Sequence, residues 1–374
     1  MLDNDVRMRR KSMTRISVLS AATVAAAAIT LVALAGCSAP TTATTSTATA
    51  AAASSSAMKD TLAYLDGGLP DLGGARIAYI AECAAANAYC QSRLKGAEET
   101  AAKAGAKLTV FDANFDPNTQ LSQVQDAVQR GFDGYVFSPV ASATGCSDLK
   151  LLQASGKPVA TINSPMCGNP DYTPGTVGFV GMQTESFFQE HAENAFKSCT
   201  SACEAVAVGG YVGSDLFTRW EDAIKAAAKK YPNVTVVSDQ PGSFDPKAAL
   251  AVVQDALAAH PKVSLVLSSW DDMTRGVEQA ITAAGKTPGK DVRIYSVGGT
   301  KDGIARVKAG AWTETSVLLP YEESSYGVVQ LARKLKTGKD TPGFAYLAEA
   351  PSVVKGPGSI FVTAKNASSF SPEY

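Results

Sequence analysis

The residues of this chain best suited to covalent chemistry are its cysteines. Besides Cys37 there are six of them, and an even number of cysteines in an exported chain is typical of a disulfide framework. Buried free thiols are the alternative. None of the spacings matches a paired C-x-x-C zinc site, so we expect no metal centre. Six cysteines can pair in many ways, so the connectivity is not determined. Cys199 and Cys203 are the pair closest in sequence, and if they bond, Cys83–Cys90 and Cys146–Cys167 would be the remaining disulfides.

Groups for acid–base or nucleophilic catalysis are few. The chain holds two histidines, His191 and His260, both in stretches with helical patterning, where we expect surface or boundary positions. It contains no G-x-S-x-G, no H-E-x-x-H and no convincing acid pair. We therefore expect no catalytic residue and no cofactor, and an extracytoplasmic hydrolase is the less favoured alternative.

The first 37 residues read as an export signal rather than as part of a fold. Basic residues between Arg7 and Arg15 precede an apolar run from Ile16 to Ala35, which is the pattern of a secretory signal peptide. An uncleaved membrane anchor is the alternative. The ending L-A-G-C resembles a bacterial lipobox, which implies that Cys37 is acylated and becomes the mature N-terminus.

Residues 38–57 contain only Ala, Ser, Thr and Pro. Such a segment has too few apolar side chains to offset the entropy lost on ordering, so we expect a disordered tether, with an Ala-rich helix as the alternative. The globular part then begins near Met58 and is long enough for two lobes. A formal net charge of −1 and no long basic run after the signal argue against nucleic acid as a partner.

A repeated stretch organises the rest of the chain. FDPNTQLSQVQDA begins at Phe115, and FDPKAALAVVQDA begins at Phe244. In each copy the Asp is a good helix N-cap, the Pro suits the first helical turn, and apolar residues follow at helical spacing. Apolar runs typical of buried parallel strands follow both helices, at 134–137 and 263–267.

The similarity between the two halves extends upstream of the repeat. Strands are predicted at 76–82 and 205–211, helices at 91–104 and 220–230, and second strands from Lys107 and Val234. Each half thus reads β-α-β-α-β, which predicts an α/β fold of two doubly wound parallel-sheet lobes joined by a hinge. Ligands of such sheets bind beyond the carboxyl ends of the strands, so two facing lobes predict a cleft.

The element order, the lipobox and three motifs together resemble the type I periplasmic substrate-binding proteins, in the ribose-binding-protein branch that serves sugar ABC importers. The motifs are FDP at Phe244, WDDMTRG at Trp270 and VGGTKDG at Val297, and the likeness covers about residues 75–355. It implies an N-terminal lobe of 58–180 plus about 319–347 and a C-terminal lobe of 181–318 plus about 348–374.

The resemblance also implies a function and partners. The chain would be a lipoprotein on the outer face of the cell membrane that captures a small polar solute and hands it to an ABC permease and ATPase. A monomer is the default for this class, and a sensory partner for a membrane kinase is an alternative role. A related sugar-sensing repressor would need an N-terminal DNA-binding motif, where this chain has the export signal.

Carried over by position, the family's binding residues correspond to a set of polar and aromatic side chains around a solute. They are Asn87, Tyr89, Asn163, Ser164, Arg219, Phe244, Trp270, Asp271 and Leu318. For some of them a structural role is the alternative: Tyr89 and Phe244 as packing within a lobe, Asn87 and Asp271 as helix caps. Cys83 lies in the same first loop, where a disulfide is the better reading.

Several of these positions depart from the family. Its acidic–basic pair becomes Asn163 and Ser164, a cleft asparagine becomes Trp270, a strand-end aspartate becomes about Gly298, and a glutamine near the hinge becomes Leu318. The two carboxylates that accept sugar hydroxyls in the family are therefore lost, which should change the choice of solute. A sugar, polyol or related neutral solute is favoured, with a sugar acid held by Arg219 or a small cyclic or aromatic compound as alternatives.

Overall fold

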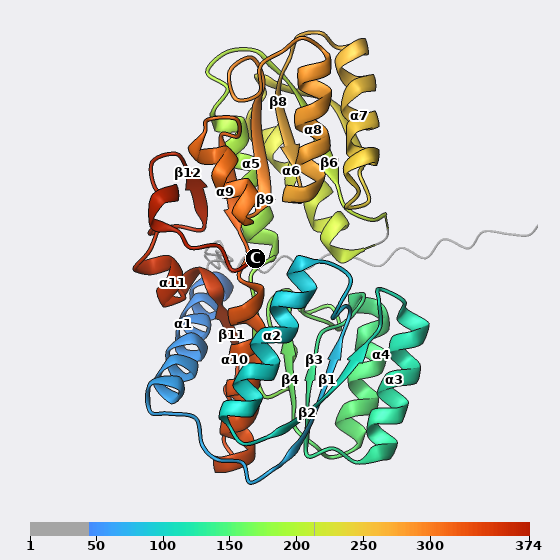
Figure 1. The fold of residues 1–374 in the computed structure, drawn as a ribbon, viewed down its shortest axis with the longest axis vertical. Helices are drawn as coiled ribbons and strands as arrows, with labels where there is room; N and C mark the ends of the chain where they lie inside the picture. The colour runs from blue at the N-terminus through green and yellow to red at the C-terminus, as the bar shows by residue number, and fades with distance from the viewer. Residues whose placement is uncertain (1–44, 213) are drawn as a thin grey trace, which may run out of the picture. The chain divides into compact units, whose positions relative to one another are not determined.

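The computed structural model describes residues 45–212 and 214–374 (Figure 1). The predicted signal peptide, the lipobox and the acylation of Cys37 lie outside the described residues. Within the described ranges, no helix has both the length and the hydrophobicity needed to cross a membrane.

The first lobe is built on a six-stranded parallel sheet, in the order β11-β5-β4-β3-β1-β2. The strands of this sheet are short and, apart from the edge strand β2, rich in buried apolar residues, as expected where helices cover both faces. The strands are β1 (Arg76–Ala81), β2 (Lys107–Asp112), β3 (Gly134–Phe137), β4 (Val159–Ile162), β5 (Phe179–Gly181) and β11 (Phe344–Tyr346).

The second lobe repeats this arrangement, with the order β12-β10-β9-β8-β6-β7. All neighbours in it are parallel except β12, which pairs antiparallel with β10. The strands are β6 (Cys203–Gly209), β7 (Val234–Pro241), β8 (Val263–Ser268), β9 (Arg293–Gly298), β10 (Glu314–Val317) and β12 (Phe361–Thr363). The two doubly wound sheets confirm the predicted fold class.

Helices cover both faces of each sheet (Figure 1). In the first lobe α2 (Ala88–Lys103) and α10 (Pro320–Thr337) pack together on one face, and α3 (Pro117–Arg130) and α4 (Ser142–Ala154) pack together on the other. In the second lobe the corresponding pairs are α5 (Glu185–Lys197) with α6 (Asp215–Lys230), and α7 (Pro246–Ala259) with α8 (Asp271–Ala283). The shorter helices α9 (Lys301–Lys308) and α11 (Pro351–Val354) follow β9 and β11.

The helix starts follow from caps that the sequence encodes. In the repeat, the Asp116 carboxylate accepts a hydrogen bond from the Thr119 N–H, and the Asp245 carboxylate accepts one from the Ala248 N–H. Both α2 and α6 begin earlier than predicted, because Asn87 and Ser214 cap them at Ala88 and Asp215. The apolar pattern marks only the buried part of a helix, whereas the cap fixes its first residue.

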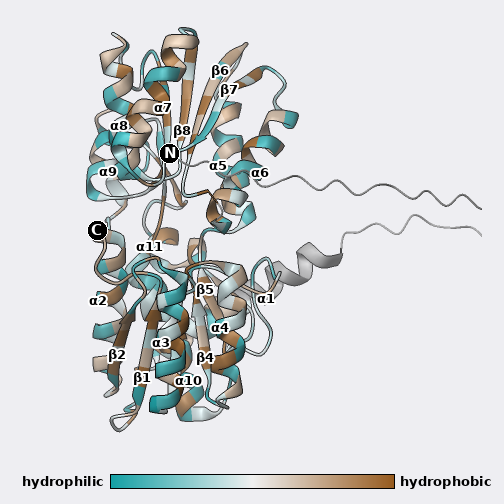
Figure 2. Cartoon of the chain, turned by 90° about the vertical axis from the view of Figure 1, so that its right-hand side faces the viewer, coloured by the Kyte–Doolittle hydropathy of each residue, from teal (hydrophilic) through white to brown (hydrophobic). Residues whose placement is uncertain are grey.

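Hydrophobic residues concentrate on the strands and on the inner faces of the helices (Figure 2). In the first lobe, Ile80, Phe132 and Phe137 pack between the sheet and α3 and α4, while Ile77 and Tyr79 face α2 and α10. The second lobe buries Trp220 and Trp312 almost completely. Buried apolar residues therefore pack against both sheets, and one cluster of them includes residues of both lobes.

The segment predicted as a disordered tether is partly helical. Helix α1 (Thr45–Asp66) includes residues 45–57, so the prediction of disorder is wrong for these residues. Alanine has the highest helix propensity, and the helix gains from docking, since Ala57 and Met58 are buried and Gln330 of α10 donates to the Thr61 hydroxyl at 3.1 Å.

The six cysteines form three disulfides, in the pairing expected if Cys199 and Cys203, the pair closest in sequence, bond to each other. The pairs are Cys83–Cys90, Cys146–Cys167 and Cys199–Cys203.

The expectation that His191 lies at a surface or boundary position is wrong: its ring is fully buried beside Trp220, and its Nδ1 lies 2.8 Å from the Ser316 hydroxyl. Among the described residues no cluster of three or more His, Cys, Asp or Glu side chains is arranged to hold a metal ion.

Candidate functional site

A cavity of about 460 Å³ is lined by residues of both lobes. Its walls are the segments that follow β1 to β5 in the first lobe and β6, β7, β8 and β10 in the second. The carboxyl ends of the parallel strands therefore converge on it, as expected for ligand sites of doubly wound sheets. The volume falls in the range of small-molecule sites. We call this cavity the cleft.

Most of the predicted site residues line the cleft. Seven of the nine do so: Asn87, Tyr89, Asn163, Ser164, Phe244, Trp270 and Leu318. Asn87 lines the cleft and is also the N-cap of α2, because its side-chain oxygen accepts a hydrogen bond from the Cys90 N–H. Whether these residues contact a solute stays a prediction.

Arg219 is not among the residues lining the cleft. Its guanidinium donates to the backbone oxygen of Gln183 at 2.8 Å, and burial lowers its pKa although Asp215, Glu185 and Asp171 act in the opposite direction. The side chain thus ties α6 to the segment between β5 and α5. Because this hydrogen bond engages the guanidinium, Arg219 is not free to bind the carboxylate of an acidic solute.

Asp271 also lies outside the cleft lining. Its side chain is 1% exposed and accepts hydrogen bonds from the Ser296 and Thr315 hydroxyls and from both the N–H and the hydroxyl of Thr300. Burial raises its pKa against these hydrogen bonds. Asp271 therefore braces α8 against β9 and β10, and its neighbour Asp272 is the carboxylate that lines the cleft.

Five aromatic residues form a wall of the cleft. Phe244 packs edge-on against Tyr211 and Trp270, with ring centroids 5.2 and 6.5 Å apart, and Tyr89 packs edge-on against Trp270 at 5.6 Å. Phe115 lies in the lining as well. Tyr89 belongs to the first lobe and Trp270 to the second, so this wall connects the two.

The two FDP turns place their phenylalanines in the cleft by the same unusual backbone. Phe115 has φ 63° and Phe244 has φ 52°, and the residue before each is also left-handed. Asn163, at the end of β4, has φ 70°. Left-handed backbone is unfavourable for such residues and concentrates at functional sites. The family resemblance did not point to Phe115, although its place in the repeat, equivalent to that of Phe244, was a signal for it.

A buried ionic cluster forms the floor of the cleft beneath Tyr89. Arg93 is fully buried and forms ion pairs with Glu82 and with Glu323, the latter at 3.1 Å. Asn163 donates to Glu82 at 3.0 Å, and the Tyr89 hydroxyl donates to Glu323 at 3.3 Å. Burial raises the pKa of Glu323 to about 7. The cluster fixes the orientation of two lining residues from below.

Carboxylates other than the two whose loss was expected line the cleft. Three of them line it: Glu82, Asp215 and Asp272. They come from positions other than the two that the family resemblance predicted, because the end of β1 and the first turns of α6 and α8 also face the cavity. The sequence signal for Glu82 was a charged residue directly after an apolar strand, at the carboxyl edge where ligands bind.

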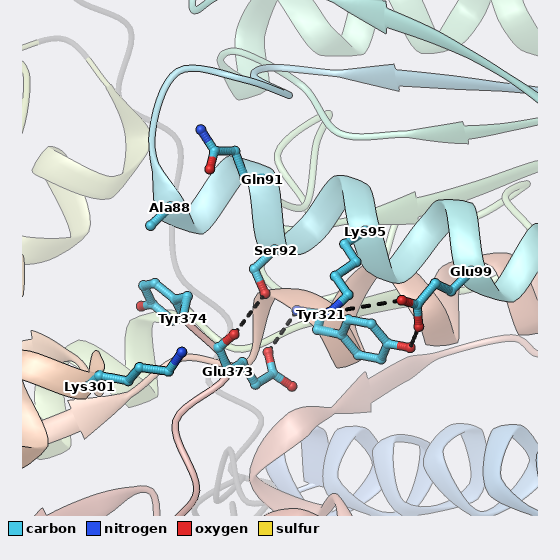
Figure 3. Close-up of a pocket in the computed structure, with 9 residues that line it drawn as sticks. All are labelled: Ala88, Gln91, Ser92, Lys95, Glu99, Lys301, Tyr321, Glu373 and Tyr374. Carbon is cyan, nitrogen blue, oxygen red and sulfur yellow. Dashed lines mark hydrogen bonds and ion pairs between the residues drawn. The ribbon is translucent and has the colours of Figure 1, made fainter.

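A short segment at 373–374 supports the aromatic wall from behind. The Tyr374 ring stacks on Trp270, with centroids 6.0 Å apart, and packs edge-on against Tyr89 at 5.8 Å; its hydroxyl donates to the Gly298 oxygen at 2.8 Å. Figure 3 shows Glu373 between α2 and the start of α10, where its carboxylate accepts from the Tyr321 N–H at 2.7 Å. The segment thus connects elements of both lobes.

Comparison with known sequences identifies relatives along most of the chain. The ribose import binding protein RbsB of Salmonella typhi is 26% identical over 253 residues, covering 68% of this chain and 82% of the relative. The xylitol-binding protein of Mycolicibacterium smegmatis is 25% identical over 244 residues, covering 65% of this chain and 67% of the relative. Both names describe binding proteins.

Comparison with solved structures shows the same fold. An ABC transporter solute binding protein from Bacillus halodurans, crystallised with bound myo-inositol, matches with a TM-score of 0.70 at 19% identity, covering 81% of this chain and 99% of the other. A galactofuranose binding protein matches with a TM-score of 0.68 at 19% identity, covering 79% and 96%. Residues 77–340, well over half of the chain, match the family model described as periplasmic binding protein domain. The chain therefore belongs to the periplasmic binding protein domain family.

Proposed function

We propose that this protein is the solute-binding component of an ABC importer for a sugar, a polyol or a related small polyhydroxylated compound. The observation that carries the proposal is the cleft itself, which both lobes line with aromatic rings and hydrogen-bonding groups. Aromatic faces suit the C–H faces of such compounds, and carboxylates and amides suit their hydroxyls. The names of the relatives, which include ribose and xylitol binding proteins, favour the same class.

Capture would take place outside the cytoplasm. The basic and apolar leader and the L-A-G-C sequence favour export and a lipid anchor at Cys37. The relatives are binding proteins, which favours capture and delivery over catalysis. The two lobes would close around the solute, and the permease would recognise this closed form.

The position of Arg219 argues against the sugar-acid alternative. Its guanidinium is engaged by the Gln183 backbone oxygen and does not line the cleft. A carboxylate solute would instead meet Glu82, Asp215 and Asp272, and like charges at close range repel.

The proposal is tested by a thermal-shift screen of the purified chain against sugars, alditols, cyclitols, sugar acids and small aromatic compounds. A solute at 100 times its dissociation constant adds about 2.7 kcal/mol to the free energy of unfolding, which raises Tm by several degrees. We expect polyhydroxylated compounds to raise Tm. Stabilisation by flat aromatic compounds alone would contradict the proposal.

A further inference from the structure

All charged side chains in the lining of the cleft are acidic. They are Glu82, Asp215 and Asp272, and no Lys, Arg or His belongs to the lining as the structure describes it. The nearby arginines, Arg93 and Arg275, lie outside the lining and pair with carboxylates of the protein. Arg93 is fully buried between Glu82 and Glu323, and Arg275 lies 3.9 Å from Asp272 with 56% of its side chain exposed. Arg93 thus compensates the charge of Glu82, and Asp215 and Asp272 are the carboxylates left to face a solute.

The cleft also contains a buried hydrogen-bond acceptor with no partner. The side-chain oxygen of Asn163 has none among the described residues, although the residue is only 6% exposed. Its amide nitrogen is already used, because it donates to Glu82 at 3.0 Å. A buried acceptor left without a partner is unfavourable, so this atom points to a solute that donates a hydrogen bond here.

The second lobe offers a similar atom opposite. The hydroxyl of Ser269, 7% exposed, has no partner among the described residues and lines the same cleft. In the same lobe, Asp215 has one carboxylate oxygen that accepts from the N–H of Ser142 at the start of α4 in the first lobe. Its other oxygen remains an acceptor. Unpartnered or partly engaged oxygen atoms therefore lie in the parts of the cleft lining that come from both lobes.

Aromatic rings complete the surroundings. Tyr89 already carries a cation, since the Arg93 guanidinium lies 5.5 Å from its ring centroid. Phe115, Tyr211, Phe244 and Trp270 remain available to a solute. Electron-rich ring faces attract ammonium groups, and aromatic cages that contain carboxylates are suited to bind them.

We propose that the solute carries a basic amine, as in an amino sugar, an amino alditol or an aminocyclitol. This inference rests on the proposed function and narrows its solute class. An ammonium group donates three hydrogen bonds and carries a positive charge, which together match the unpartnered acceptors, the carboxylates of Asp215 and Asp272, and the rings. A neutral hydroxyl at the same place supplies the hydrogen bond without the charge, and an acid supplies neither.

The experiment compares matched compounds by isothermal titration calorimetry at pH 7 with the purified full chain. Each pair differs at one substituent: D-glucosamine with D-glucose, glucamine with D-glucitol, and scyllo-inosamine with scyllo-inositol, with D-glucuronate as the acid. A charge-assisted hydrogen bond exceeds a neutral one by roughly 1.4 kcal/mol, which corresponds to about a tenfold difference in Kd. We expect the amine of at least one pair to bind about tenfold more tightly than its neutral partner.

Two isosteric variants locate the effect. Asp272→Asn and Asp215→Asn keep the shape and the acceptor oxygen but remove the charge, so each should weaken amine binding by about tenfold and neutral binding by less than about threefold. Asp255→Asn, on the exposed side of α7, removes the same charge elsewhere and should leave both unchanged. Equal losses for amine and neutral compounds would contradict a charge-selective role.

The outcomes separate the inference from the proposed function. Neutral members that bind as tightly as their amines, or D-glucuronate that binds most tightly, overturn the amine inference and leave the importer role standing. Binding by neither the amines nor the neutral compounds, with binding by unrelated compounds, overturns both.

Discussion

Trp270 is the side chain that joins the parts of the candidate site. Its ring contacts Phe244, Tyr89 and Tyr374, and it stands at the N-cap of α8 without using its side chain for capping. A large aromatic residue that is free of structural hydrogen bonds and lines a cavity is the kind of residue that dominates binding energy.

Replacing Trp270 by alanine should therefore weaken solute binding strongly. We expect a loss of about 2–3 kcal/mol, or roughly a hundredfold in Kd, measured by calorimetry with the best compound from the screen. Leu121→Ala, a 37% exposed apolar position on α3 outside the cleft, is the control for loss of apolar surface and should bind normally. An affinity within a few-fold of the wild type for Trp270→Ala would place the solute elsewhere.

His191 shows how one buried residue carries a pH dependence. Burial lowers the pKa of its imidazole to about 3, so the folded protein holds the ring neutral while the unfolded chain would protonate it near its usual pKa. This stabilises the fold above about pH 6.5, and the contribution is lost as the pH falls towards 3.

The test for His191 is a proton NMR titration. Its ring C–H resonances, assigned by their absence in His191→Gln, should not move between pH 8 and pH 5. A shift with a midpoint between pH 6 and 7 would show that the ring reaches solvent and titrates normally.

At the scale of elements, the two FDP turns and the 373–374 segment set the geometry of the cleft. Each FDP turn ends a strand, caps a helix with its aspartate and points its phenylalanine to the cavity. The 373–374 segment lies behind the aromatic wall, where Tyr374 contacts a residue from each lobe. Short connecting segments thus carry the candidate site, while the helices and strands hold them in place.

Tyr374 should affect binding as a positioning residue. Tyr374→Ala removes the ring that supports Trp270 and Tyr89, and an aromatic pair contributes about 0.5–1.5 kcal/mol, so Kd should rise by up to about tenfold. Tyr374→Phe keeps the ring and loses only the hydrogen bond to the Gly298 oxygen, so its Kd should rise by less than about threefold. Equal Kd values for Tyr374→Ala and the wild type would show that Trp270 needs no support from this segment.

At the scale of the whole molecule, buried carboxyl groups give the fold a pH profile. Burial raises the pKa of Glu314 to about 8, that of Glu373 to about 8 and that of Glu323 to about 7. Their folded-state pKa lies above the unfolded value near 4.5, so their contribution is complete below about pH 4.5 and is lost as the pH rises through 7 and 8.

The free energy of unfolding should therefore fall as the pH rises towards 8, and above about pH 7.5 His191 is neutral in both states and adds nothing to this slope. Each such group contributes a slope of up to about 1.4 kcal/mol per pH unit. Urea unfolding at half-unit pH steps measures this slope. Glu314→Gln, which removes one titrating group of a buried side chain, should flatten it, and an unchanged slope would show that Glu314 does not titrate with folding.

The sequence by itself determined the two doubly wound lobes, because the repeated order of apolar runs, caps and turns is local information that each half states separately. Most of the site residues that the family resemblance implied line the cleft, since they follow strand ends, but they are a minority of its lining. Only the tertiary structure decided which charges face the cavity. The orientation of Arg219, Asp271 and Glu82 depends on which partners lie across the fold: the Gln183 oxygen, the hydroxyls of β9 and β10, and Arg93. Side chains on one helical turn can point to different partners, and no pattern along the chain records that choice.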